Sequence, residues 1–195
     1  LKKQKFGALL AGAAGSENKP RLAVFTYAPK NAKKTVVLVG KGVTFDSGGI
    51  NLKPSGSIET MKTDMSGAAA VAGTLIAVAG LKPKVKVIGV IPIVENMPSG
   101  SATRPGDVIK TYDGKTVEIG NTDAEGRLIL IDAISWAIKK YKPDTVIDMA
   151  TLTGACVVAL GERIAGVFSG DDHLADDIVA SGDKTHERCW RPPLP

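Results

Sequence analysis

The octapeptide NTDAEGRL, residues 121 to 128, places two carboxylates and a guanidinium at alternate positions, Asp123, Glu125 and Arg127. Carboxylates this close repel each other unless a cation lies among them. Between residues 40 and 70, four further charged residues are candidates: Lys41, Asp46, Lys53 and Asp64. Singly, these residues have ordinary explanations, because aspartates form turns and cap helices. Together, four acids beside the ends of apolar elements predict a site for divalent metal ions.

The ligands on offer are carboxylate oxygens and one amine, which suit hard or borderline ions such as Mg²⁺, Mn²⁺ or Zn²⁺. Two ions about 3.5–4 Å apart would need bridging carboxylates of this kind. The two histidines, His173 and His186, lie in the polar C-terminal region and are interpreted as surface residues. A two-metal phosphatase or nuclease is an alternative, but the sequence has no GxxxxGK[ST] phosphate loop.

The elements that must position these residues alternate between β-branched runs and helical patterns. Strands are predicted at 21–28, 34–40, 84–94, 144–150 and 163–170, and helices at 66–80, 126–141 and 171–181, with a short one at 153–160. Several strands are apolar on both faces, as buried strands are. The pattern predicts an α/β protein, a three-layer α/β/α sandwich around a mixed, largely parallel sheet.

Two irregular segments qualify this prediction. The Gly/Ser-rich segment 46–57 follows the carboxyl end of a predicted strand, where α/β proteins usually place their sites. Residues 107–121 contain two short alternating strands around Asp113-Gly114, which predicts an antiparallel hairpin that returns the chain to the sheet.

Composition narrows the class of protein further. A chain of 195 residues with 44% hydrophobic side chains can bury one sizeable core. The two cysteines, Cys156 and Cys189, are too few for a disulfide scaffold, and no secretion leader opens the chain, so a cytoplasmic protein is predicted. The apolar run 68–81 is shorter than the roughly 20 residues that cross a bilayer, which predicts a buried helix and no membrane partner. The net charge of +5 comes from short lysine clusters without interleaved aromatics, which favours a solvated face over a nucleic-acid groove.

Three segments carry a resemblance to a known family. They are VGKGVTFDSGG (39–49), LKPSGSIETMKTDMSGAAAV (52–71) and NTDAEGRLILIDA (121–133). Together they resemble the leucyl aminopeptidases, the dinuclear-metal M17 family of cytosol aminopeptidases, over nearly the whole chain. The resemblance implies that residues 1–15 end an interdomain helix and that 16–195 belong to the metal-binding catalytic domain, with its C-terminal part missing.

The resemblance also implies a division of the charged residues. Asp46 and Glu125 would bridge two metals, and Asp123 would complete the more loosely held site. Lys41 and Asp64 would complete the tighter site, with Lys41 as a neutral amine. An ammonium of Lys41 paired with Asp46 is the alternative.

The remaining implied residues act on the substrate. Lys53 would hydrogen-bond the developing gem-diolate oxygen, and Arg127 would hold a bicarbonate ion that serves as general base. A structural Arg127 paired with Asp123 one helical turn away is the competing interpretation. The family's substrate contacts and apolar side-chain pocket map onto Met61, Thr151, Leu152 and Gly154.

The function implied by the resemblance is a metal-dependent aminopeptidase that hydrolyses N-terminal residues, preferentially leucine and similar apolar residues, from peptides with a free N-terminus. Zn²⁺ or Mn²⁺ is expected, with Mg²⁺ as an alternative in one site, in a cytoplasmic homo-hexamer. Some relatives are DNA-binding accessory proteins and others have lost the site. Against such a loss, every metal-binding and catalytic position holds the residue type that the family pattern expects.

Overall fold

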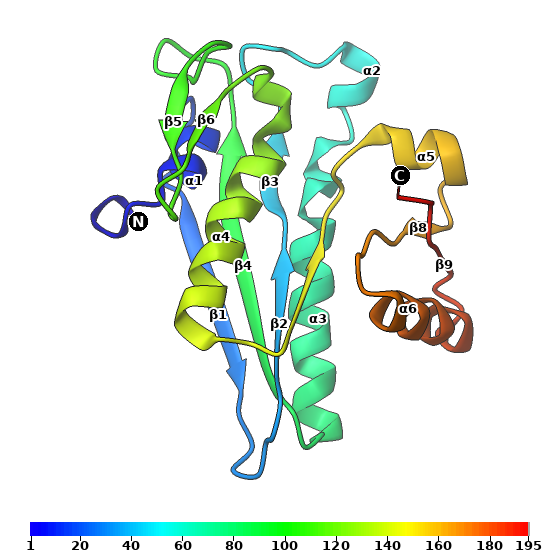
Figure 1. Cartoon of the computed structure of the whole chain (residues 1–195). Coiled ribbons are helices and arrows are strands. Elements are labelled where there is room, and N and C mark those ends of the chain that lie inside the picture. The colour runs from blue at the N-terminus through cyan, green and yellow to red at the C-terminus, as the bar shows by residue number, and fades with distance from the viewer. Residues whose placement is uncertain (195) are drawn as a thin grey trace. The chain divides into compact units, whose positions relative to one another are not determined.

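The computed structural model describes residues 1–194. The chain divides into two compact units, Leu1–Leu152 and Thr153–Pro195. The first unit contains the sheet and both long central helices, and the second contains two helices and a pair of very short strands (Figure 1).

The first unit is built on one five-stranded sheet. Its strands are β1 (Arg21–Tyr27), β2 (Thr35–Gly40), β3 (Gly42–Asp46), β4 (Lys86–Asn96) and β7 (Thr145–Met149). The order is β1-β4-β2-β7, and β3 also pairs with β4. Strand β1 is antiparallel to β4, whereas all other pairings are parallel. The mixed, largely parallel sheet predicted from the sequence is therefore confirmed.

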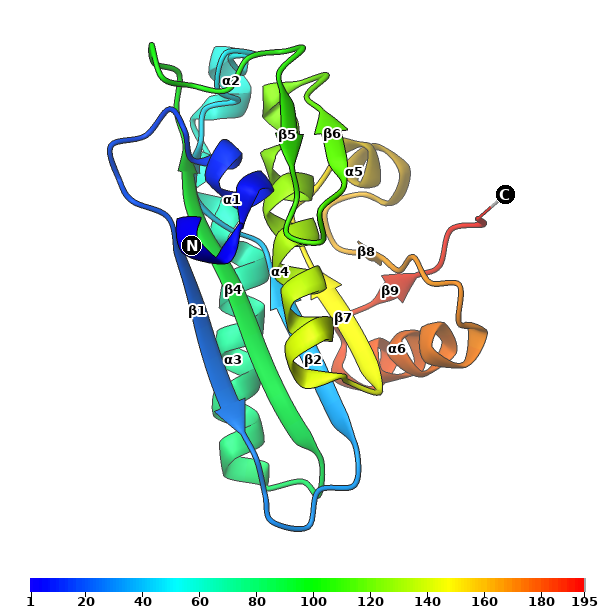
Figure 2. The same cartoon turned by 60° about the vertical axis from the view of Figure 1, so that its left-hand side comes forward.

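Helices cover both faces of this sheet. Helix α3 (Ser66–Leu81) packs on one face, and α4 (Glu125–Tyr141) packs on the other with α1 (Gly7–Gly12) against it (Figure 2). Successive side chains of β2 point to opposite faces of the sheet, so this strand contributes to both hydrophobic cores. Val37 and Val39 pack in the core that contains α4, and Leu38 packs in the core that contains α3. Two apolar faces need two helical layers, and this confirms the α/β/α sandwich.

Several elements differ from the prediction. Strand β3 was not among the predicted strands, yet Val43 is fully buried and the segment pairs with β4. The antiparallel hairpin predicted within residues 107–121 is confirmed as β5 (Val108–Lys110) and β6 (Thr116–Glu118), which form a two-stranded sheet of their own. The predicted N-terminal connecting helix is interrupted: a 3₁₀ turn, η1 (Lys2–Gln4), ends at Lys5 in the left-handed region before α1 begins.

The buried helix expected over residues 68–81 also differs from the structure. Val71 and Leu75 of α3 pack on the sheet, but Ile76 and Leu81 are 76% and 80% exposed. Only one face of α3 is therefore buried in this unit. By length and composition alone, Met61–Leu81 is apolar enough to cross a membrane, a test that core helices of soluble proteins also pass.

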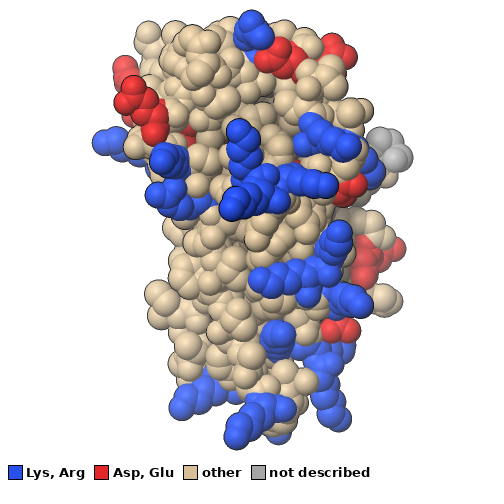
Figure 3. Space-filling model, turned by 90° about the vertical axis from the view of Figure 1, so that its left-hand side faces the viewer, with Lys and Arg blue, Asp and Glu red and all other residues tan. Residues whose placement is uncertain are grey.

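Basic side chains form several groups rather than one continuous patch on the face that Figure 3 shows. Two lysines of α4 make cation–π contacts with aromatic rings of the same chain: Lys140 Nζ lies 4.6 Å from the ring centroid of Trp136, and Lys139 Nζ lies 5.8 Å from that of Tyr112. These contacts are typical of a solvated face that packs its lysine stems on apolar surface.

The second unit contains α5 (Gly154–Leu160), β8 (Ala165–Gly166), α6 (Asp172–Thr185) and β9 (Cys189–Trp190). The strand predicted at 163–170 is reduced to the two residues of β8, which pair in parallel with β9. Helix α6 begins where predicted because the Asp171 carboxylate accepts a hydrogen bond from Leu174 N at 3.1 Å. It extends beyond the predicted end, to Thr185.

Candidate metal centre

The charged residues singled out in the sequence gather at one edge of the sheet. Lys41 directly follows β2, Asp46 ends β3, and Thr151 lies two residues beyond β7. Parallel strands end at the same edge, so these positions are neighbours despite their separation in sequence. Glu125 adds its carboxylate as the first residue of α4, and Asp64 lies in the short 3₁₀ helix η2 (Met61–Met65) that leads into α3.

Hydrogen bonds between side chains and backbone join two segments at this edge. The Thr122 hydroxyl, in the 3₁₀ turn η3 (Thr122–Ala124), donates to Gly48 O at 2.7 Å and accepts from Asn51 N at 2.8 Å. The Asn51 side chain in turn accepts from Thr122 N at 2.9 Å. Gly48 has φ +87°, and a Cβ there would come within 2.8 Å of an oxygen of Asp123. The loop after β3 can therefore approach the NTDAEGRL segment only with glycine at this position.

The carboxylates are close together and mostly buried. One oxygen each of Asp46, Asp123 and Glu125 lies within 4.8 Å of the others. Asp46, Asp64 and Glu125 are 2%, 3% and 1% exposed. Buried like charges at this spacing are unfavourable without cations.

Two lysines offset part of the negative charge of the cluster in the structure. Lys41 Nζ lies 2.8 Å from Asp64 Oδ1 and 3.0 Å from Glu125 Oε1. Lys53 Nζ lies 3.1 Å from Asp46 Oδ2 and 2.7 Å from Asp123 Oδ1. The alternative pairing of Lys41 with Asp46 is therefore wrong, because Asp46 is paired with Lys53 and the Lys41 ammonium points to Asp64 and Glu125.

Burial and charge compete in setting the pKa values here. Burial lowers the pKa of Lys41, but the charges of Glu125 and Asp64 outweigh it, so that this pKa is raised. Lys53 shows the same balance, with hydrogen bonds to Asp123 and Asp46 raising its pKa against the effect of burial. Burial raises the pKa of Glu125 to about 7, opposed by Lys41 and assisted by Asp46.

The oxygen atoms of this cluster fit divalent cations. Asp64 Oδ2 is buried and has no hydrogen-bond partner among residues 1–194. Asp123 Oδ1 and Glu125 Oε1 are also buried without a hydrogen bond in the same range, although each faces a lysine ammonium. Buried acceptors without donors are costly unless a cation binds them. Carboxylate oxygens around such a point are the ligands that Mg²⁺, Mn²⁺ and Zn²⁺ accept.

The other predicted residues lie at differing distances from this cluster. Thr151 contacts it directly: its hydroxyl donates to Asp64 Oδ1 at 2.7 Å, and its carbonyl accepts from Lys41 Nζ at 3.0 Å. Arg127 is exposed on the first turn of α4 and forms no ion pair with Asp123 in the described chain. Met61 is half-buried at the start of η2.

Two predicted substrate contacts lie near the boundary between the units. Leu152 ends the first unit and is 37% exposed. A Cβ added to Gly126, at the start of α4, would come within 3.1 Å of its Cδ1 atom. Gly154 begins α5 in the second unit, so the structure assigns it no place at this site.

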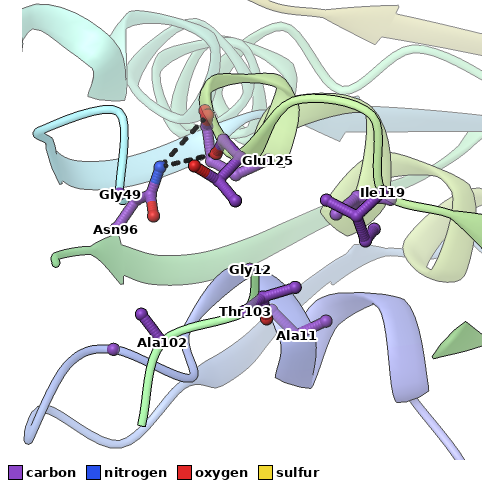
Figure 4. A pocket seen from close by; sticks show the side chains of 11 residues that line it. Ala11, Gly12, Gly49, Asn96, Ala102, Thr103, Ile119 and Glu125 are labelled. Carbon is purple, nitrogen blue, oxygen red and sulfur yellow. Dashed lines mark hydrogen bonds between the residues drawn. The ribbon is translucent and has the colours of Figure 1, made fainter. Parts of the chain in front are cut away.

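Two buried polar residues at the site are absent from the predicted set, Asn96 and Thr122. Asn96 ends β4, and its amide donates to Asp46. It also contacts Glu125, as Figure 4 shows. The available signal was a polar residue at the carboxyl end of a long buried strand, which is where sites in α/β proteins lie. Thr122 lies inside the NTDAEGRL octapeptide, and its hydroxyl joins this segment to the loop after β3.

The fold and the site together define a class, the α/β proteins with a carboxylate cluster suited to metal ions at the carboxyl edge of a largely parallel sheet. Comparison with known proteins makes this specific: the chain belongs to the cytosol aminopeptidase family, whose catalytic-domain model matches residues 1–195.

Similar curated proteins come from several bacteria. A probable cytosol aminopeptidase of Chlorobium limicola is 62% identical over 189 residues, which cover 96% of this chain and 38% of that protein. A probable cytosol aminopeptidase of Rickettsia massiliae is 54% identical over 196 residues, covering 100% of this chain and 39% of that protein. The chain therefore spans less than two fifths of the length of these relatives.

Proposed function

We propose that the protein to which this chain belongs is a metal-dependent aminopeptidase that removes N-terminal residues from peptides, with a preference for leucine and similar apolar residues. The observation that carries the proposal is the convergence of Asp46, Asp123 and Glu125 within 4.8 Å, beside an unpartnered Asp64 oxygen. The names of the curated relatives support the same activity.

The chain's own ligands divide between two divalent ions, Zn²⁺ or Mn²⁺, with Mg²⁺ as an alternative in one site. Asp46 and Glu125 would contact both ions, Asp123 one of them, and Lys41 with Asp64 the other. Bound divalent ions supply a water of lowered pKa and a positive field for a developing oxyanion. Lys41 would bind only as a neutral amine, so the proton that Glu125 and Asp64 now stabilise would have to leave.

Two cationic residues are proposed to act without binding metal. Lys53 has a flexible stem and a side chain that is 16% exposed, so its ammonium can donate a hydrogen bond to the scissile carbonyl oxygen as that oxygen gains charge. Arg127 is exposed beside the cluster, and its planar fork suits a bicarbonate ion that would accept the proton of the attacking water.

The substrate contacts remain part of the proposal. The Thr151 hydroxyl and carbonyl lie at the Lys41–Asp64 pair, so the chain after β7 borders the site. Met61, Leu152 and Gly154 would line the apolar side-chain pocket with it. A free α-amine of the peptide would complete the coordination, which restricts hydrolysis to the N-terminal bond. We further propose that the full-length protein is a cytoplasmic homo-hexamer.

The test uses the full-length protein and leucyl-p-nitroanilide. Hydrolysis should be lost in chelator and return when Mn²⁺ or Zn²⁺ is restored. Glu125→Ala should empty both sites by metal analysis, whereas Lys53→Ala should keep its metal and lose turnover. Hydrolysis that persists in chelator would refute the dinuclear mechanism. Loss of metal from Lys53→Ala would refute the division into ligands and catalytic residues.

A further inference from the structure

We propose that Asn96 is a positioning residue for the metal centre: its amide holds one oxygen each of Asp46 and Glu125 and thereby directs their other oxygens toward the cations. The inference rests on the proposed function, because it concerns the two carboxylates assigned there to both ions. It adds a residue from β4 to a site otherwise assigned to the segments after β2 and β3 and to the start of α4.

The amide of Asn96 has three oxygen acceptors around its nitrogen. Nδ2 lies 2.9 Å from Asp46 Oδ1, 3.1 Å from Thr122 O and 3.4 Å from Glu125 Oε2, so its two hydrogens are shared among three acceptors. Figure 4 shows the contact to Glu125. A backbone carbonyl cannot donate, and neither can an ionised carboxylate. The orientation of the amide is therefore determined by its surroundings, with the NH₂ group facing the acids. Asn96 is only 7% exposed, so water does not compete strongly for these bonds.

In each carboxylate, one oxygen faces the Asn96 amide and the other faces a lysine. Asp46 uses Oδ1 for Asn96 and Oδ2 for Lys53, 3.1 Å away. Glu125 uses Oε2 for Asn96 and Oε1 for Lys41, 3.0 Å away. The oxygens that face positive charge are the ones that Asn96 does not contact. An amide between two acids can orient both without adding charge, which a lysine at the same place could not do.

The backbone places Asn96 for this role. Asp46 and Asn96 are register partners at the ends of β3 and β4. Ser47 donates to Asn96 O from both its backbone nitrogen, at 3.0 Å, and its hydroxyl, at 2.7 Å. Behind the amide, Gly49 leaves room that a Cβ would take, since it would come within 2.9 Å of Asn96 Oδ1. Asn96 and the end of β3 are therefore held as one unit.

Glu125 depends on this amide more than Asp46 does. Asp46 Oδ1 also accepts a hydrogen bond from Gly48 N at 3.0 Å. Glu125 Oε2 has no other donor among the described residues. The small hollow on this side of Glu125 is lined largely by groups without side-chain donors, such as Ala11, Gly12 and Ile119 (Figure 4). Loss of the amide should therefore release Glu125 first, and both ions should bind less tightly because Glu125 is assigned to both.

The experiment measures Mn²⁺ binding to the full-length protein, after chelator treatment, from the electron paramagnetic resonance signal of free Mn²⁺. The variants are Asn96→Ala and Asn96→Ser, which are small enough to admit water beside the hollow. The matched control is Asn18→Ala, because the Asn18 amide also donates to a carboxylate, Glu95 Oε2 at 3.0 Å, but is exposed. Folding of each metal-free variant is followed by circular dichroism.

We expect about 10- to 100-fold weaker Mn²⁺ binding at both sites in the Asn96 variants, and a change below about twofold in the control. A folded Asn96→Ala protein that binds Mn²⁺ as wild type does would overturn the inference and leave the proposed function intact. Failure of both Asn96 variants to fold, with the control folded, would also overturn it, because Asn96 would then serve the fold in general. Absence of Mn²⁺ binding by the wild type would instead refute the proposed metal centre.

Discussion

Asp132 offers a test of the packing that supports the site. Its side chain lies in the middle of α4 and is 0% exposed. Oδ2 accepts from Leu9 N at 2.9 Å, at the start of α1, and Oδ1 accepts from Tyr112 N at 2.7 Å, in the hairpin between β5 and β6. One carboxylate therefore ties two distant segments to the helix whose first residue is Glu125.

The cost of removing it follows from these two bonds. Asp132→Ala leaves two backbone N–H groups without an acceptor, that of Leu9 buried and that of Tyr112 partly buried. An orphaned group of this kind costs about 1–3 kcal/mol. The free energy of unfolding should therefore fall by about 2–6 kcal/mol. That is a large part of the roughly 5–15 kcal/mol that stabilises a typical domain.

The measurement is the urea midpoint of the full-length protein in chelator, so that metal binding does not mask the change. Asp144→Ala is the matched control, because Asp144 Oδ2 accepts from Thr35 N at 2.7 Å through the same kind of bond but is exposed. We expect the control to lose no more than about 1 kcal/mol. If both substitutions shift the urea midpoint equally, burial does not determine how much such a hydrogen bond contributes to stability, and the reasoning is refuted.

Three further changes test the site itself. In Gly126→Ala, the new Cβ would come within 2.7 Å of Lys41 Cε, so Lys41 must move and Mn²⁺ binding should weaken, whereas Gly56→Ala, with nothing within 4 Å, should bind as wild type does. In chelator, the pKa of Glu125 is raised from 4.5 to about 7, so the folded state holds the proton more tightly. The resulting stability is complete below pH 4.5 and is lost as pH rises through about 7. The melting temperature of Glu125→Gln should not show this decrease with rising pH. If the melting temperatures of the variant and the wild type change equally with pH, the assignment is contradicted. Arg127→Ala should retain its metal content and lose turnover, and added bicarbonate should not restore it; a loss of metal would argue for a structural role.

Much of the fold was predictable because burial leaves a local signature. Strands β1, β2, β4 and β7 were predicted within two residues of their ends, since apolar runs bounded by turn residues are typical of buried strands. Helix α4 was equally clear from its period. Strand β3 was not, because two glycines beside Lys41 indicate a loop, and only pairing with β4 shows that Gly42 and Val43 are extended.

The acidic and basic residues of the candidate site were also visible in the sequence, since charged side chains beside apolar elements are unusual and NTDAEGRL is distinctive. Their pairing was not visible. Lys41 contacts Asp64 and Glu125 rather than Asp46, and this choice depends on how η2 and α4 approach the end of β2.

The sequence by itself thus determined which elements form and which residues carry charge, because both depend on side-chain type and on spacing along a few turns. Only the tertiary structure decided that Asn96 lies between Asp46 and Glu125, although the sequence separates it from them by 50 and 29 positions. Strand order and register bring such residues together, and these follow from packing over the whole sheet, which no local pattern records.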